Sequence, residues 1–169
     1  MGYVGIDLGT SAVKISYIDE EARILRSVTK DYPICYPEEG WAEQNPEDWW
    51  NAVCEGMLEI TNAKDFSGLD AIGLGGQMHG LVALDEYGTV IRPAILWNDT
   101  RTAKETAILN TALGKDVLLK ETGNIAYAGF TAPKLLWMRT HEPEQFAKIE
   151  HILLPKDYIL YRLSGAFST

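Results

Sequence analysis

A glycine turn between two apolar strands is the first segment of the sequence that can do chemistry. The run Val4-Gly5-Ile6-Asp7-Leu8-Gly9-Thr10-Ser11 places an acid, a glycine and two hydroxyl residues at the end of an apolar strand. Gly9 permits a tight turn, and the amides and hydroxyls there can face phosphate oxygens. The carboxylate of Asp7 can face a hydrated metal ion. The pattern therefore predicts a phosphate site in a hairpin turn.

This turn is not a Walker A loop, because no Gly-Lys-Ser/Thr ending follows it and the next residues alternate as a strand does. The alternative is an ordinary hairpin turn in which Asp7 is a solvated acid. Lys14, on the second strand, can reach a phosphate, although a lysine on an alternating strand more often points to solvent.

A second loop, Gly75-Gly76-Gln77-Met78-His79-Gly80, surrounds an amide, a thioether and an imidazole with glycines. The glycines permit close approach of the backbone, and Gln77 and His79 suit a hydroxylated ligand. The alternative for His79 is a loop histidine that is bonded to a backbone carbonyl.

A third loop, Trp97-Asn98-Asp99-Thr100-Arg101, places an aromatic face beside an amide, an acid and a guanidinium. Such a set can bind sugar hydroxyls by stacking and by bidentate hydrogen bonds. The alternative is a core tryptophan followed by a helix cap at Asp99 or Thr100. If the strands before the loops share one sheet, and the second and third loops leave it at the same edge, the polar groups meet in one crevice.

Hydrophobic periodicity predicts the elements that position these loops. Strands at about 3–7, 13–19 and 24–32 form an antiparallel meander. Asn45 caps a helix that runs from Pro46 to about Asn62, with an apolar face made of Trp50, Val53, Cys54, Met57 and Leu58. A short buried strand follows at 71–74.

Further strands are predicted at 81–85 and 94–97, followed mostly by helices. The helices lie at about 99–114 and 116–123, from Pro133, from Glu142-Pro143 and at 156–163, with a brief apolar run at 152–154. Gly114, Gly123 and Gly165 mark the ends of three of these helices. Strands that come first and then alternate with helices indicate an α/β fold in one domain, residues 1–169.

Composition excludes several classes of partner. Of 169 residues, 15 are basic and 24 acidic, so the net charge of −9 disfavours nucleic acid and anionic membrane surfaces. Two cysteines without a metal-type pairing, no secretory signal and no apolar run of membrane-spanning length lead us to expect a cytoplasmic protein.

Five motifs together closely resemble the amino-terminal half of the carbohydrate kinases, the FGGY family, and within it the kinases that act on xylulose. They lie at residues 5–11, 76–80, 93–99, 129–137 and 154–158. The first motif is shared with actin-like and heat-shock ATPases. Gln77-Met78-His79 together with Phe130 to Trp137 is far more specific.

The resemblance implies a ribonuclease H-like, actin-like ATPase domain, with a mixed sheet, flanking helices, and sugar and ATP bound between two such domains. It implies that ATP phosphorylates D-xylulose to D-xylulose 5-phosphate with Mg²⁺. Carried over by position, Met78 and His79 contact the sugar and Asp7 is needed for activity near the metal. Further expected ligand contacts are Gln77, Trp97, Asn98 and Asp99 for the sugar, and Gly9, Thr10, Ser11 and Lys14 for the ATP phosphates.

The resemblance also places the general base, an aspartate, and the adenosine-binding residues in a carboxy-terminal kinase domain, beyond residue 169. We therefore expect this chain to be inactive or nearly so by itself. Alternatives are a kinase for ribulose, gluconate or glycerol, an actin-like or heat-shock-like nucleotide-binding module, and a catalytically silent interaction domain. Association into a homodimer is left open.

Overall fold

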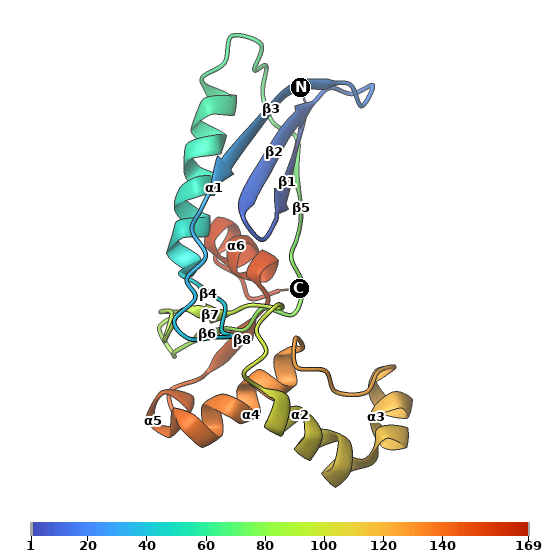
Figure 1. Ribbon diagram of the computed structural model, residues 1–169. Coiled ribbons are helices and arrows are strands. Elements are labelled where there is room, and N and C mark those ends of the chain that lie inside the picture. Colours follow the sequence, from blue (N-terminus) through green and yellow to red (C-terminus); the bar gives the residue numbers. More distant parts are fainter. Residues whose placement is uncertain (1, 169) are drawn as a thin grey trace. The chain divides into compact units, whose positions relative to one another are not determined.

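The computed structural model describes residues 2–168, which form two compact units (Figure 1). Unit 1 contains the residues up to Ile34, Asn45–Gln77 and the residues from Pro155 on, whereas unit 2 contains Cys35–Gln44 and Met78–Leu154. The expectation of one domain over residues 1–169 stays a prediction.

Unit 1 is built on a four-stranded mixed sheet in the order β3-β2-β1-β5 (Figure 1). The strands are β1 (Tyr3–Leu8), β2 (Ala12–Ile18), β3 (Ile24–Asp31) and β5 (Ala71–Gly76). The first three pair antiparallel and β5 pairs parallel with β1. The expected mixed sheet with a leading meander is confirmed.

Alternation along β1 and β2 gives the sheet one buried and one exposed face. Val4, Ile6 and Leu8 of β1 are buried, as are their neighbours on β2. The intervening residues Asp7 and Lys14 are exposed and stand opposite each other in the strand register. The two-residue period therefore fixes Asp7 on the solvent side.

Helix α1 (Pro46–Thr61) begins as expected, because the Asn45 side chain accepts a hydrogen bond from the Glu47 N–H at 3.2 Å. The expected apolar face is confirmed at Val53 only. Leu58 is 60 % exposed, and Trp50, Cys54 and Met57 are only half-buried. The buried residues are Pro46, Trp49, Ala52, Val53, Gly56 and Ile60.

Close packing explains this rotated face of α1. A Cβ atom on Gly56 would lie 2.7 Å from the Ile15 side chain, so the helix backbone approaches β2 at a glycine. Ala52 and Gly56 carry little hydrophobic signal, although they permit this approach. Trp49, Val53 and Ile60 supply the large apolar side chains of the buried face.

Strand β5 was expected to be buried, and that expectation is wrong. It is the last strand of the sheet order, and four of its six residues are exposed, among them Ile72 at 39 %. An apolar run predicts a buried strand only where neighbours cover both faces, which is not the case among the described residues.

Unit 1 is completed by α6 (Pro155–Ser164), whose Arg162 pairs with Glu47 of α1 at 2.5 Å. The helix ends before Gly165, which has a φ of +73°. The predicted last helix and its glycine stop are confirmed. No helix within residues 2–168 combines the length and apolarity needed to cross a membrane.

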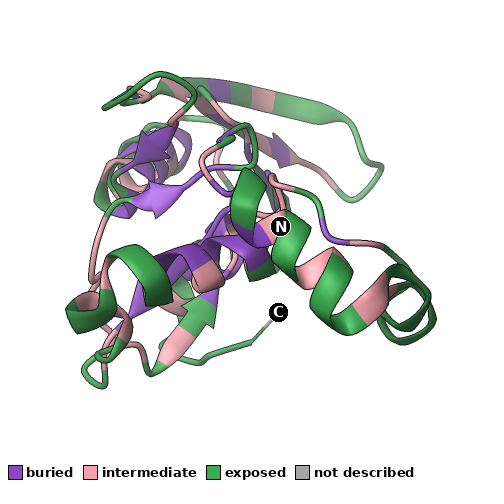
Figure 2. Cartoon of the chain, turned by 60° about the horizontal axis from the view of Figure 1, so that its bottom comes forward, coloured by how far each residue is buried: buried purple, intermediate pink, exposed green. Residues whose placement is uncertain are grey.

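Unit 2 contains two small antiparallel sheets, and its strands are mostly buried (Figure 2, purple). β4 (Glu43–Gln44) pairs with β7 (Ala94–Ile95), and β6 (Val82–Leu84) pairs with β8 (His151–Leu153). The hypothesis that the strand before Trp97 shares the main sheet is therefore wrong. The late apolar run forms β8, which pairs back with β6.

The helices of unit 2 follow the predicted spacing. They are α2 (Ala103–Leu109), the π-helix η1 (Asn110–Gly114), α3 (Lys115–Thr122), α4 (Thr131–His141) and α5 (Pro143–Phe146). The expected cap at Asp99 or Thr100 is wrong, because α2 begins after Thr102, whose hydroxyl bonds to the Ala128 carbonyl instead. Trp137 and Met138 anchor α4 in a core with Leu81, Ala83 and Ile95.

Candidate functional site

The predicted phosphate loop is the hairpin between β1 and β2 in unit 1. The Gly9 N–H donates to the Ala12 carbonyl at 3.0 Å, and a Cβ atom on Gly9 would lie 2.9 Å from that same oxygen. The turn is thus as tight as glycine allows. Thr10 is half-buried and Ser11 is exposed. The exposed Asp7 and Lys14 flank the loop on its two strands.

Two side chains hold this loop from the ends of neighbouring strands. The Tyr32 hydroxyl donates to the Gly9 carbonyl at 2.6 Å, and the Gln77 amide donates to the same oxygen at 3.3 Å. Burial, together with the charge of Asp7, raises the pKa of Tyr32, so its hydroxyl keeps its proton. Gln77 therefore supports the phosphate loop, and its expected contact with a sugar stays a prediction.

The parallel pairing of β1 and β5 brings Gly75–Gln77, the part of the second predicted loop that belongs to unit 1, to the same end of the sheet as the first loop. Leu8 stands opposite Gly76, and the Gln77 N–H donates to the Leu8 carbonyl at 2.7 Å. A Cβ atom on Gly76 would lie 2.8 Å from both the Leu8 side chain and its carbonyl oxygen. The glycine before Gln77 is therefore needed for the close approach of the two strand ends.

In unit 2, Met78 and His79 form a tight turn. The Gly80 N–H donates to the Met78 carbonyl at 2.9 Å, and His79 has a φ of +63°. This left-handed conformation is uncommon for a residue other than glycine. The Met78 side chain is 61 % exposed and His79 is half-buried. The turn therefore leaves the Met78 side chain accessible and the His79 side chain partly accessible.

The His79 imidazole lies against an aromatic ring. Its ring stacks on Phe130 with centroids 4.2 Å apart, and Tyr127 lies against Phe130 at 5.2 Å. Burial, together with the charge of Lys134, lowers the pKa of His79. The imidazole is thus neutral at neutral pH and can both donate and accept a hydrogen bond.

Trp97 is 48 % exposed, so the alternative of a core tryptophan is wrong. Its carbonyl lies so close to Gly129 that any Cβ at that position would overlap with it. The loop that carries Phe130 therefore lies beside the Trp97 backbone. Asn98 is also exposed. Unit 2 thus brings the loops of His79 and Trp97 to the same Gly129–Thr131 segment.

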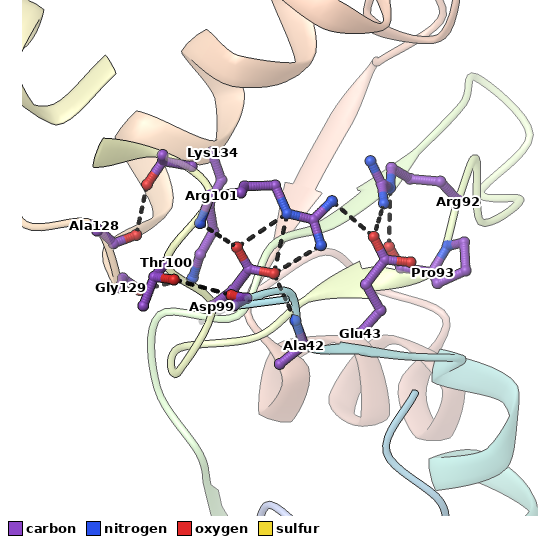
Figure 3. Close-up of polar contacts among 12 residues, drawn as sticks. Ala42, Glu43, Arg92, Pro93, Asp99, Thr100, Arg101, Ala128, Gly129 and Lys134 are labelled. Atoms are coloured by element: carbon purple, nitrogen blue, oxygen red, sulfur yellow. Dashed lines mark hydrogen bonds and ion pairs between the residues drawn. The ribbon is translucent and has the colours of Figure 1, made fainter. Parts of the chain in front are cut away.

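Asp99 lies in a different environment from Trp97 and Asn98. It is buried and accepts hydrogen bonds from the Ala42 N–H at 2.7 Å and from the Arg101 side chain at 2.7–3.0 Å (Figure 3). The carboxylate therefore fixes the loop from inside. Its expected contact with a sugar stays a prediction.

Arg101 belongs to a chain of buried ion pairs (Figure 3). Its guanidinium lies 2.8 Å from Glu43 and 3.6 Å from the centre of the Trp41 ring. Glu43 also pairs with Arg92, which pairs with Glu142 at 2.6 Å. Two guanidinium groups and three carboxylates from four distant segments thus pair with one another around the Trp97 loop.

The structure reveals one buried cation that the sequence did not single out. Lys134 of α4 is 0 % exposed, and its ammonium donates to the carbonyls of His79 at 2.7 Å and Gly129 at 2.6 Å. Burial lowers its pKa to about 7, while Asp99 raises it and Arg101 lowers it further. The sequence feature that could have identified it is a lysine on the apolar face of a predicted helix, because lysine is almost never fully buried without a partner.

Unit 2 contains a cavity of about 310 Å³ whose lining includes His79 and Phe130. It is lined mainly by apolar side chains, among them Leu109, Leu113, Leu118 and Pro133 from the helices and Ile125 from the loop between α3 and α4. Its apolar lining does not suit a sugar. Because the phosphate loop and the His79 turn belong to different units, their meeting in one crevice stays a prediction.

The sequence matches the N-terminal domain of the FGGY family of carbohydrate kinases over residues 2–169. It is 42 % identical over 167 residues to the xylulose kinase of Escherichia coli strain K12, covering 99 % of this chain and 34 % of that protein. It is 44 % identical over 171 residues to the xylulose kinase of Bacillus subtilis strain 168, covering 98 % and 34 %. The chain thus spans about a third of the length of these relatives.

The fold agrees with this match. The crystal structure of xylulose kinase from Rhodospirillum rubrum superimposes with a TM-score of 0.95 at 27 % identity, over 100 % of this chain and 36 % of that one. Gluconate kinase from Lactobacillus acidophilus gives 0.92 at 27 % identity, over 98 % and 34 %. The chain belongs to the FGGY family of carbohydrate kinases and has their α/β, actin-like ATPase fold.

Proposed function

We propose that this chain is the sugar-binding side of an ATP-dependent kinase that converts D-xylulose to D-xylulose 5-phosphate. The observation that carries the proposal is the Met78–His79 turn, where a neutral imidazole is stacked on Phe130. A neutral donor and acceptor on an aromatic support suits a hydroxylated, uncharged ligand. The two relatives at 42 % and 44 % identity are xylulose kinases.

The exposed Trp97 and Asn98 support the same proposal. A tryptophan face can stack on a sugar ring or chain, and an amide can bond to two hydroxyls. Both residues lie on the loop whose backbone approaches Gly129, next to the support of His79. Asp99 and Arg101 keep that loop in place through buried charges.

The hairpin of unit 1 is the proposed ATP-facing part. Gly9, Thr10 and Ser11 offer amides and hydroxyls for phosphate oxygens, and Lys14 offers a cation on the adjacent strand. Mg²⁺ prefers oxygen donors and keeps several waters, so an exposed carboxylate at Asp7 fits a contact through water. The metal would neutralise charge on the phosphates.

Phosphate transfer further needs the general base and the adenosine contacts that the family resemblance places in a carboxy-terminal domain. We therefore expect the 169-residue chain to bind sugar but not to transfer phosphate at a rate typical of enzymes, about one turnover per second or more. A homodimer and a cytoplasmic location stay predictions.

Titration calorimetry of the purified chain tests the proposal. D-xylulose should bind, and His79→Ala should weaken binding about tenfold through the lost hydrogen bond and stacking. His141→Ala, an exposed histidine of the same unit, is the matched control and should bind as the wild type does. Glycerol, ribulose and gluconate are the competing ligands.

Four outcomes contradict the proposal. Tighter binding of another polyol would reassign the substrate, whereas ATP binding with no sugar binding would favour the actin-like module. Binding that His79→Ala leaves unchanged would place the sugar elsewhere. Rapid phosphorylation of D-xylulose by the chain alone would refute the need for a second domain.

A further inference from the structure

We propose that Lys134 is a positioning residue that holds the Met78–His79 turn in its left-handed conformation. The ammonium lies in the core of unit 2 and donates to the His79 carbonyl at 2.7 Å. A second hydrogen bond, to the Gly129 carbonyl at 2.6 Å, ties the same group to the loop that carries Phe130. One side chain thus joins the backbone of His79 to its aromatic support.

The turn needs such a partner. A left-handed conformation costs a residue other than glycine about 1 kcal/mol, and His79 has a φ of +63°. Its carbonyl receives a second donor, the Thr131 hydroxyl at 3.2 Å. Both donors come from the first turn of α4, so the carbonyl oxygen is held by one rigid element.

That element is itself anchored. Trp137 and Met138, one turn further along α4, are buried in the core with Leu81, two residues after His79. The distance between the start of α4 and the turn is therefore fixed by packing on one side and by Lys134 on the other. The position of the imidazole, which stacks on Phe130, therefore depends on the position of this backbone.

Burying lysine is costly, which argues that its hydrogen bonds matter. A methionine would fill a similar volume without the cost of removing a charge from water. The contacts of the ammonium are main-chain oxygens of two loops, 50 positions apart in sequence. The hydrogen bonds of Lys134 therefore fix the geometry of those two loops.

Lys134→Met tests this role by NMR of the histidines, of which the chain has only 3. The imidazole pKa of His79 should rise, because a nearby positive charge is gone, and its ring should lose the upfield shift that stacking on Phe130 causes. The signals of His141 should stay in place. Lys120 is an exposed lysine of α3, and Lys120→Met is the charge control. It should change neither the pKa of His79 nor the upfield shift of its ring.

Lys134→Gln is the conservative variant, because it keeps two N–H donors on a shorter side chain. We expect His79 signals between those of the wild type and Lys134→Met. If Lys134→Met does not fold, the His79 signals of Lys134→Gln test the proposal instead, because a shorter side chain must displace the turn. Unchanged His79 signals in a folded variant would overturn the proposal.

Sugar binding is the second measurement, and it rests on the proposed function. Lys134→Met should weaken D-xylulose binding by about 10- to 100-fold, as expected when a contact group is displaced. Equal affinity of wild type and variant would overturn the positioning role. If the wild type does not bind D-xylulose, the proposed function fails, and the His79 signals still decide the role of Lys134.

Discussion

The phosphate loop of unit 1 and the Met78–His79 turn of unit 2 are held by different kinds of contact. The loop is a hairpin of main-chain hydrogen bonds, with Tyr32 and Gln77 bonded to one carbonyl from adjacent strand ends. The turn depends on a buried ammonium and lies in a unit stabilised by buried ion pairs from distant segments. Neutral hydrogen bonds thus hold the loop that is proposed to face phosphate, whereas buried charged groups hold the turn that carries His79.

This difference has an energetic consequence. A buried charge that loses its partner keeps its full desolvation cost, while a lost neutral hydrogen bond costs much less. Unit 2 should therefore be the more sensitive to single substitutions, and its sensitivity should depend on pH. Three predictions test this comparison.

The largest effect is expected at Arg101. Arg101→Met leaves Asp99 and Glu43 buried with one partner fewer, so the free energy of unfolding should fall by about 3–5 kcal/mol. Urea unfolding followed by tryptophan fluorescence measures it. Arg23→Met in unit 1 is the matched control, because Arg23 also pairs with two carboxylates but is 72 % exposed, and it should cost less than about 1 kcal/mol. Equal losses of the free energy of unfolding in the two variants would contradict the proposed difference between the units.

A smaller effect is expected where unit 1 relies on close backbone approach. Gly76→Ala places a methyl group against Leu8, so we expect a loss of about 1–3 kcal/mol from overpacking. Gly75→Ala, one residue earlier on β5, meets no atom within 4 Å and should leave the melting temperature nearly unchanged. If both variants have the same melting temperature, the ends of β1 and β5 can separate further than the structure indicates.

The smallest effect is a pH dependence at Lys134, whose pKa is lowered to about 7 in the folded protein. Between pH 7 and the unfolded pKa of about 10.4, the unfolded state binds more protons, so this group makes stability rise with pH. Well below pH 7 both states are protonated, so the contribution is constant there. The stability difference between wild type and Lys134→Met should shift in favour of the wild type by about 1–2 kcal/mol from pH 7 to pH 9. A difference that stays flat would mean that the ammonium keeps its ordinary pKa.

Many local features could be predicted from the sequence. The first hairpin, the Asn45 cap and the helix stops at Gly123 and Gly165 depend on residues that are close together in the chain. Hydrogen bonds of short range and the two-residue strand period determine them. The motifs of the predicted site loops also indicated the family correctly.

The buried faces could not be predicted in the same way. The buried side of α1 combines Trp49 and Ile60 with two small residues, Ala52 and Gly56, that contribute little to a hydrophobic pattern. The strand before Trp97 pairs with β4, a two-residue strand with no periodicity to detect. Pairing between segments distant in sequence leaves no signal in either segment alone.

The sequence by itself determined which residues can do chemistry and the turns that carry them. Asp7, Gly9 and His79 were identified from local patterns, and their loops lie where those patterns predict. Only the tertiary structure decided that Asp99 lies in a buried ion pair, that Trp97 is exposed and that Lys134 bonds to the His79 backbone. The reason is that the free energy of a buried charge depends on the partners that folding brings to it from elsewhere in the chain.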